Sequence, residues 1–490
     1  MTGLTGAGII IVVILVTGAG MLAGRQVKDN SDFLTGGGRA GKFITTGAIV
    51  GTLIGSQSTV GTAQLAFNYG ISACWFTVGT GLGCLVLGLL YSDKLRHSGC
   101  VTQFQIISRS YGALTEKAGA VLCTTGTFVS ILAQNIACIG FIMTLYPNIN
   151  ALQASLISII LMCLYIILGG TWGAGLGGIV KLTLVYITCA LSCVIAIFNA
   201  GGLQEIFSNA ETLLTSSGLG RVQKIFSHDD FINRYMNLTA RGVFKDLGSC
   251  SALILGILST QTYMQFILSA KGDSEAKSSV LWGLAMVPPV GFACIFIGLF
   301  MRANYVTLSE VSELASLGLS VPDLPVIAST IQVFPAFIIN HVSPLLGGIM
   351  LGTLLVTVIG GSSGLLLGIS AIVTEDLLQA VSFVKAHKLL FSRLVIVITL
   401  IIASVIANIF PAQAINDLGV ISMTLRASVV FMPLTCALWL ETRVKGHSVL
   451  ASMIISPLAA IIGALLNLPV EPLFIAVSIS VIFCLSGLVF

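Results

Sequence analysis

The sequence predicts an all-α polytopic membrane protein with about thirteen transmembrane helices. Hydrophobic residues make up 56% of the 490 residues and charged residues only 9%, whereas soluble domains carry about 25% charged residues. The mean hydropathy is +1.02, and apolar runs of roughly 20 residues, long enough to cross a bilayer, recur along the chain. A spanning segment must satisfy its own backbone polar groups, so we expect these runs to be helices.

The apolar runs follow one another in order along the whole chain. We expect spans at about 6–24, 43–68, 72–92, 118–146, 151–169, 174–201, 247–270, 278–301, 344–373, 390–410, 417–440, 448–467 and 472–490. The first run has no basic residue before it, and Arg25 and Lys28 follow it directly. A signal peptide has the opposite charge order, so this helix is expected to be retained, with the N-terminus outside.

Basic residues are divided unequally between the two sides that thirteen spans define. Most of those in loops fall on the inner side, and the outer ones, except Arg302, lie in the long loop from Gly202 to Asp246. Long loops translocate largely regardless of charge. The sequence therefore predicts an integral plasma (inner) membrane protein with its C-terminus inside. Lys181 and Arg426 are then the only basic residues within spans.

Two spans contain polar clusters where apolar residues are expected. The second holds GTLIGSQSTVG at 51–61, and the seventh holds LSTQTYMQ at 258–265. Five spans separate their starts, which is the spacing of an inverted five-helix repeat whose first helices are unwound to bind solute at the midplane. The alternative is that these hydroxyl groups only bond back to their own helix.

The remaining composition excludes several classes of protein. The net charge of +4 gives no indication of nucleic acid, so the expected partners are a small-molecule solute and the lipid bilayer, with the protein acting as a monomer. Twelve cysteines lie scattered with no CxxC pair, which favours core hydrophobes over disulfides or metal ligands. With no nucleotide loop, metal constellation or catalytic group in the sequence, we expect neither an enzyme nor a cofactor.

Four stretches occur in an order that is typical of one transporter family. They are SDFLTGGGR at 31–39, GGTWGA at 169–174, QTYMQFILSAK at 261–271 and IVTED at 372–376. Together they resemble the sodium:solute symporter family, which contains the proline, sialic acid and sodium-glucose transporters. The resemblance implies alternating access and a leucine-transporter-type fold, a five-plus-five inverted repeat with unwound first and sixth core helices.

The resemblance also implies a division of the chain into five parts. These are an extra N-terminal helix and inner loop (1–42), the first inverted repeat (43–201), an outer loop (202–246), the second inverted repeat (247–440) and two C-terminal helices (441–490).

The resemblance implies positions for a sodium site, and the chain departs from the family there. The backbone carbonyl ligands fall on Gly51, Ile54 and Thr357, but the expected pair of hydroxyl residues falls on Gly360 and Gly361. Two side-chain oxygens are therefore missing, and sodium binding is in doubt. Ser362 and Ser363 would replace them only if the register slipped by two residues, which rotates a helix by about 200°.

A second departure concerns the one lysine inside a span. Where the family carries an Asp followed three residues later by a Gln, this chain has Gly178 and Lys181. A charge near mid-bilayer costs at least about 2.5 kcal/mol on insertion scales, so it needs either a route to water or a role. We expect the Lys181 ammonium to fill the vacated sodium site, as a lysine does in sodium-independent amino-acid transporters of this fold. The alternative is that Lys181 reaches the aqueous interface.

Polar residues at the two breaks and on the third core helix are candidates for binding solute. They are Ser56, Gln57, Ser58, Gln134, Asn135, Thr260 and Gln261. Arg426 also lies deep in a span that offers no clear carboxylate, and a guanidinium pairs best with a carboxylate. A carboxylate of the solute would meet this need, although Arg426 bonded to free carbonyls or in an aqueous vestibule is an open alternative.

These features together predict a secondary active transporter of a small polar solute, with an amino acid or small organic carboxylate favoured. The degraded sodium site favours proton-coupled or sodium-independent transport. One alternative is a conventional sodium-coupled symporter of a neutral solute. A solute sensor is the other, and it would need a separate output partner because the sequence ends within its last span.

Overall fold

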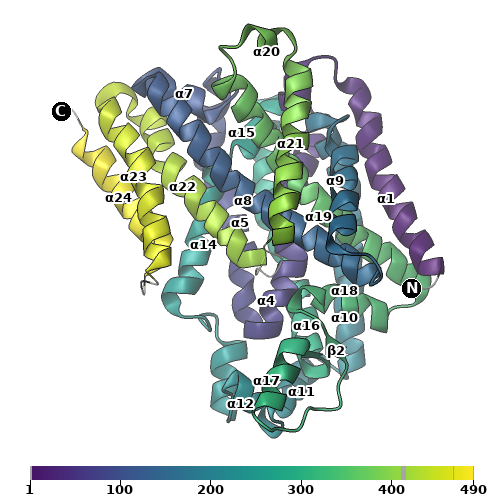
Figure 1. Cartoon of the computed structure of the whole chain (residues 1–490). Coiled ribbons are helices and arrows are strands. Elements are labelled where there is room, and N and C mark those ends of the chain that lie inside the picture. The colour runs from purple at the N-terminus through teal and green to yellow at the C-terminus, as the bar shows by residue number, and fades with distance from the viewer. Residues whose placement is uncertain (1–2, 410–414, 467, 469, 489–490) are drawn as a thin grey trace.

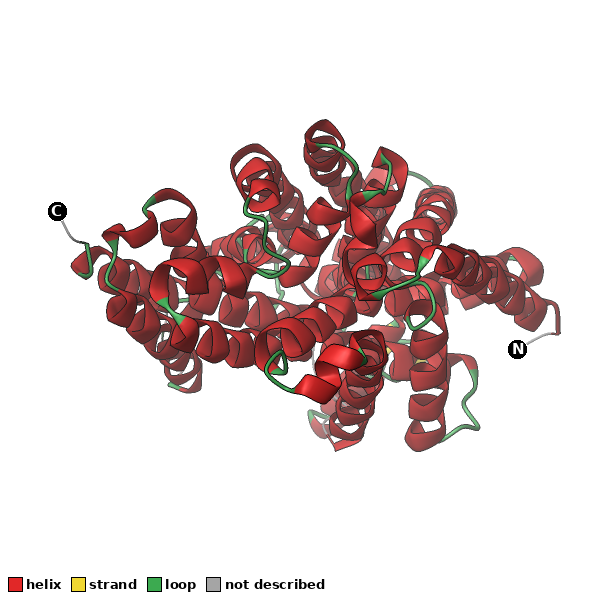
Figure 2. Cartoon of the chain, turned by 90° about the horizontal axis from the view of Figure 1, so that it is seen from above, coloured by secondary structure: helices red, strands yellow, loops and turns green. Residues whose placement is uncertain are grey.

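The computed structural model describes residues 3–409, 415–466, 468 and 470–488. Helices make up nearly all of this part of the chain, as both views show (Figures 1 and 2). The only strands within the described ranges are β1 (Val306–Thr307) and β2 (Val326–Ile327), which pair in parallel. The prediction of a nearly all-helical protein is confirmed.

The described α-helices follow one another with short connections. Their bounds are α1 Gly3–Ala23, α2 Asn30–Thr35, α3 Lys42–Leu53, α4 Thr62–Tyr69, α5 Cys74–Val86, α6 Ser92–His97, α7 Gln103–Tyr111, α8 Ala113–Leu145, α9 Ala151–Ile166, α10 Gly170–Ala200, α11 Leu203–Ser216, α12 Leu219–Gln223, α13 His228–Phe231, α14 Val243–Leu258, α15 Gln261–Ser269, α16 Asp273–Asn304, α17 Leu308–Ser316, α18 Val333–His341, α19 Pro344–Ala371, α20 Ser382–Ala386, α21 Lys388–Ile409, α22 Ile415–Trp439, α23 Gly446–Leu465 and α24 Pro472–Ser486.

Nine described helical segments are long and apolar enough to cross a membrane, and a bent pair of helices makes a tenth candidate. Shorter apolar helices lie at Lys42–Leu53, Ala151–Ile166 and Pro472–Ser486. The described part of each of the thirteen predicted ranges contains helix. The number of membrane crossings stays a prediction.

Both polar clusters coincide with breaks in helices. In the first, α3 ends at Leu53, a π-helical turn, η3, covers Gln57–Gly61, and α4 begins at Thr62. In the second, α14 and α15 are bent by 47°, because Thr260 between them has extended backbone angles, φ −99° and ψ 116°. The carbonyls at the end of α3 and α14 therefore lack the helical partners that a continuous helix would give them.

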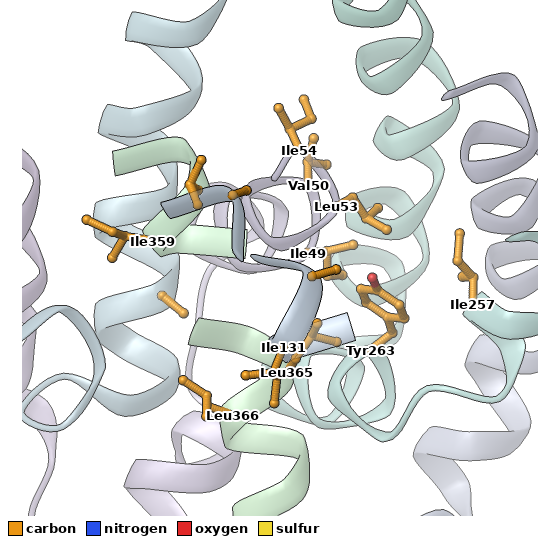
Figure 3. Close-up of a cluster of buried hydrophobic side chains, with 14 of the residues drawn as sticks. Ile49, Val50, Leu53, Ile54, Ile131, Ile257, Tyr263, Ile359, Leu365 and Leu366 are labelled. Atoms are coloured by element: carbon orange, nitrogen blue, oxygen red, sulfur yellow. The ribbon is translucent and has the colours of Figure 1, made fainter. Parts of the chain in front are cut away.

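The breaks lie in the middle of the molecule, against the long helix α19. The most apolar part of the segment Pro344–Leu377 is 94% buried, and α19 packs against α1, α3, α8 and α10. Figure 3 shows Leu53, Ile257, Tyr263 and Leu365 in one buried cluster beside the breaks. This core holds the ends of the broken helices in place.

Helices α3 and α10 approach each other closely through glycines. A Cβ on Gly178 would lie 2.7 Å from the carbonyl carbon of Gly47, and one on Gly51 would lie 3.0 Å from the Cα of Gly178. A larger residue at these positions would push the helices apart, since real Cβ atoms do not come so near. The close approach brings Lys181 on α10 to the end of α3.

The segment 202–246, which the sequence predicts to be an outer loop, contains helices. It forms α11, α12 and α13, and Figure 1 shows α11 and α12 gathered with α17 at the lower end of the molecule. Ile206, Leu214 and Leu219 on α11 and α12 join a small core with Leu314 on α17. The sequence prediction missed these helices because they are too short to be read as spans.

Candidate functional site

The Lys181 side chain ends at the first break. It is fully buried, and its Nζ donates hydrogen bonds to the backbone carbonyl of Ile54 at 2.9 Å and to that of Gly51. These two carbonyls are ones that the break leaves without a helical partner. The ammonium group of Lys181 therefore lies between two of the carbonyl oxygens that the family resemblance assigns to a cation, those of Gly51 and Ile54.

Gly360 and Gly361 on α19 lie beside this point. A Cβ on Gly360 would lie 2.8 Å from Lys181 Nζ and 3.0 Å from its Cδ, while one on Gly361 would lie 2.8 Å from Nε2 of Gln134. The space that a side chain at position 360 would need is thus filled by Lys181, and the space at position 361 is filled by the Gln134 amide.

Among the described residues, the ammonium group forms no hydrogen bond with the other residues assigned to the cation site. Within the described residues no hydrogen bond joins Lys181 to Thr357, whose Oγ1 bonds to the carbonyl of Thr353 at 2.6 Å. Gly178 faces α3 and leaves no room for a carboxylate. Ser362 and Ser363 bond back to the carbonyls of Val358 and Gly360, at 3.3 and 2.7 Å.

A small cavity of about 20 Å³ lies next to this site, with room for about one water molecule. Residues from six α-helices and η3 line it: Thr52, Leu53, Gln57, Phe76, Thr80, Ser130, Gln134, Tyr263, Leu365 and Met423. Amide and hydroxyl groups face aromatic and thioether groups, a mixture that suits a small solute with one polar end. A solute needs more room than this conformation offers, so the cavity must widen to admit it.

Gln57 and Gln134 are the two predicted solute residues that line the cavity. Gln57 Nε2 donates to Ser130 Oγ at 3.3 Å. Gln134 Oε1 accepts a hydrogen bond from the backbone N–H of Ser56 at 3.0 Å and another from Ser56 Oγ. Ser58 Oγ donates to the carbonyl of Leu53 at 2.8 Å, as in the alternative that these hydroxyl groups bond to their own helix.

Asn135 and Gln261 do not line this cavity. The Asn135 amide bonds to Ser404 on α21 and Ser158 on α9, both at 2.7 Å. Gln261 Oε1 accepts from the Gln103 backbone N–H, and its Nε2 donates to the carbonyl of Val101, both at 2.9 Å. Their amides instead join α8 to α9 and α21, and α15 to the segment 101–103.

Arg426 is fully buried and reaches the second break. Its guanidinium donates to Thr260 Oγ1 at 2.6 Å, to Ser422 Oγ at 3.1 Å and to the carbonyl of Ser422 at 3.2 Å. It also lies 3.1 Å from the sulfur of Met423, which lines the cavity. Arg426 forms no ion pair with any carboxylate of the described residues.

Several residues that line the cavity were absent from the sequence prediction. Ser130 lies one helical turn before Gln134, so helical spacing from Gln134 would have found it. Tyr263 lies in the same polar cluster as Thr260, but the prediction for that cluster rests on its amide and hydroxyl groups and not on an aromatic ring. Phe76, Thr80 and Met423 carry no signal in the sequence, because only the packing of α5 and α22 against the breaks brings them there.

A buried ion pair lies against α4, the second half of the first broken helix. Arg302 NH1 donates to Glu310 Oε1 at 2.6 Å, and its guanidinium lies 4.3 Å from the Phe67 ring centre. Burial by itself would raise the pKa of the Glu310 carboxyl, but Arg302 and hydrogen bonds from Thr307 outweigh it and hold that pKa below its ordinary value.

Comparisons with known proteins agree with this architecture. A model of the sodium:solute symporter family matches residues 33–455. A solved Na⁺-coupled sialic acid symporter in a substrate-bound outward-open state superposes with a TM-score of 0.76 over 99% of this chain and 97% of that one, at 14% identity. This likeness shows the fold.

Curated relatives are distant. A monocarboxylic acid transporter of Corynebacterium glutamicum is 22% identical over 86% of this chain and 76% of its own length. A high-affinity choline transporter of Caenorhabditis elegans is 23% identical over 58% and 46%, and a symporter of Bacillus subtilis is 22% identical over 59% and 54%. The chain thus spans about half the length of the choline transporter and of the Bacillus symporter.

Proposed function

The chain belongs to the sodium:solute symporter family, and we propose that within it Lys181 replaces the coupled sodium ion, so that transport proceeds without sodium. Membership makes the protein a membrane-embedded secondary symporter of a small solute and not an enzyme. One observation carries the proposal: Lys181 Nζ donates to the carbonyls of Gly51 and Ile54. A sodium ion and an ammonium group cannot share this place.

The environment of Lys181 favours replacement over a route to water. Its side chain is fully buried, and Nζ bonds to the two carbonyls instead of reaching the interface. An ammonium group next to unpaired carbonyls supplies the positive charge and the donors that a bound cation would supply. A proton that leaves and returns to Nζ would couple transport to the proton gradient.

We further propose a small monocarboxylate as the solute. Arg426 is buried without a carboxylate partner among the described residues, and its contact Met423 lines the cavity. A solute carboxylate would pair with it as a planar fork. Among the relatives, the monocarboxylic acid transporter matches the chain more fully than the choline transporter does, and a cation such as choline would meet repulsion from two buried positive groups.

The finer architecture belongs to the same proposal. We place an inverted repeat at 43–201 and 247–440, between an N-terminal helix with its inner loop at 1–42 and two C-terminal helices at 441–490, with 202–246 on the outer side. Thirteen crossings would put the N-terminus outside and the C-terminus inside a plasma membrane. In this proposal the protein acts as a monomer.

A binding screen with the purified protein tests this function. Thermal stability is measured with small monocarboxylates, their amides, choline and sugars, each in sodium chloride and in potassium chloride. A ligand stabilises by an amount set by its concentration over its dissociation constant. We expect stabilisation by a monocarboxylate that is equal in both salts and weaker for its amide. Stabilisation that requires sodium, or that choline or a sugar provides instead, would contradict the proposal.

A further inference from the structure

A second cavity, separate from the solute site, opens on the membrane-facing side of α3, α10 and α16. Its volume is about 400 Å³, within the range of ligand pockets. Its walls include Ile179 and Leu182 on α10 and Met286 on α16. Phe43 at its edge is 81% exposed. In a membrane-spanning protein such exposed apolar side chains face lipid, so this groove is open to the bilayer.

One end of the groove carries a positive charge that no protein carboxylate neutralises. Lys42, the first residue of α3, lines the groove, and its Nζ lies 5.8 Å from the centre of the Trp282 ring. Two basic residues close by have carboxylate partners: Arg39, three residues earlier, pairs with Asp32, and Lys271, whose backbone N–H bonds to the carbonyl of Ala40, pairs with Glu275. Among the described residues Lys42 forms no ion pair, so its charge is available to a ligand.

The position of this charge matches the headgroup level of a bilayer. Lys42 begins a helix at the end of the groove, and Trp282 beside it is half exposed. Tryptophan and lysine are typical of the membrane interface, where a ring and a flexible ammonium group meet lipid headgroups. Basic pockets between membrane helices bind the headgroups of anionic lipids.

We propose that this groove is a binding site for one anionic phospholipid. The headgroup phosphate would pair with Lys42, and an acyl chain would lie along Ile179, Leu182 and Met286. The groove also includes Gly47, which lies one turn before Gly51 on α3. A bound lipid would therefore brace the α3–α10 contact that holds the carbonyl of Gly51 against Lys181. The lipid site depends on these membrane helices and not on the proposed coupling.

Native mass spectrometry of the delipidated protein tests this site. The probes are phosphatidylglycerol, phosphatidylcholine and inorganic phosphate. We expect one phosphatidylglycerol to bind in preference to phosphatidylcholine, and Lys42→Gln to reduce that preference about fivefold, since one basic residue near the surface contributes about that much. Lys117→Gln, which removes an exposed lysine at the start of α8 outside the groove, is the matched control and should keep the preference.

A second pair of variants separates the groove from general charge effects. Thr183 lines the groove on the exposed side of α10, and its hydroxyl only bonds back to the carbonyl of Ile179. Thr183→Trp should fill the groove and weaken binding of both lipids, whereas Ile187→Trp, one turn further on the same exposed face, should not. Equal binding of the two lipids to the wild type, unchanged preference in Lys42→Gln, or inorganic phosphate competing as strongly as phosphatidylglycerol would overturn the proposal.

Discussion

Replacing Gly360 by serine tests whether Lys181 fills the space of the missing hydroxyl side chain. The new Cβ would lie 2.8 Å from Lys181 Nζ, 3.0 Å from its Cδ and 3.3 Å from its Cε. Overpacking of this kind costs about 1 to 3 kcal/mol. If the ammonium group moves aside, at least one of its two carbonyl bonds is lost, at about 1.5 to 3 kcal/mol for a charged donor.

Whichever of these two responses occurs, Gly360→Ser should cost the protein with Lys181 about 1 to 3 kcal/mol of stability. In Lys181→Ala the space is empty, so the same serine should cost much less. Residues in direct contact show such non-additive effects, whereas independent sites add within about 0.5 kcal/mol. The Gly360→Ser change should thus be far more harmful with Lys181 present than without it.

The assay is a double-mutant cycle of thermal unfolding on the purified protein, with the four proteins measured in sodium-free buffer. Gly347→Ser on the same helix is the control, because its Cβ would meet nothing nearer than 3.6 Å. It should be close to neutral in both backgrounds. Additive effects of Gly360→Ser and Lys181→Ala would refute the reasoning, since they would mean that the two positions do not compete for space.

Three further predictions concern the solute and the ion pair of Arg302 with Glu310. Gln57→Ala should weaken solute binding about 5- to 150-fold by leaving Ser130 unpaired, and unchanged affinity by calorimetry would move the solute elsewhere. Arg426→Lys should reduce affinity for a carboxylate more than for its amide, because lysine cannot form the bidentate fork, and equal losses would argue against the anchor. Glu310→Gln should lower thermal stability at pH 7. Since the Glu310 pKa lies below its ordinary value, that carboxylate stabilises the fold above about pH 4.3, and the difference from wild type should shrink as pH falls below it; a pH-independent difference would contradict this.

The sequence predicted the helices and both breaks well because each has a local signal. Apolar length marks the spanning helices, and the polar clusters at 51–61 and 258–265 coincide with the ends of α3 and α14. Lys181 also stood out locally, since a lone charge in an apolar run is costly. Its contact with Gly51 and Ile54 could be anticipated only through the family resemblance.

The orientation of side chains around the breaks could not be predicted in the same way. Thr260 has an extended backbone, so the helical phase is reset and Gln261 turns toward Gln103 instead of the cavity. Asn135 follows Gln134 by one residue, about 100° around α8, and so faces α9 and α21. Met423 reaches the cavity only through tertiary packing of α22, for which one sequence carries no signal.

The most direct test of the central claim is solute uptake into proteoliposomes in sodium-free buffer with a pH gradient, comparing the wild type with Lys181→Met. Methionine fills similar space but donates no hydrogen bond to the carbonyls of Gly51 and Ile54. Loss of one hydrogen bond from a charged donor costs about 1.5 kcal/mol or more, which corresponds to an uptake rate at least about tenfold lower. We predict uptake by the wild type without sodium and a loss of at least that size in Lys181→Met. Uptake that requires a sodium gradient, with Lys181→Met equal to the wild type, would contradict the account.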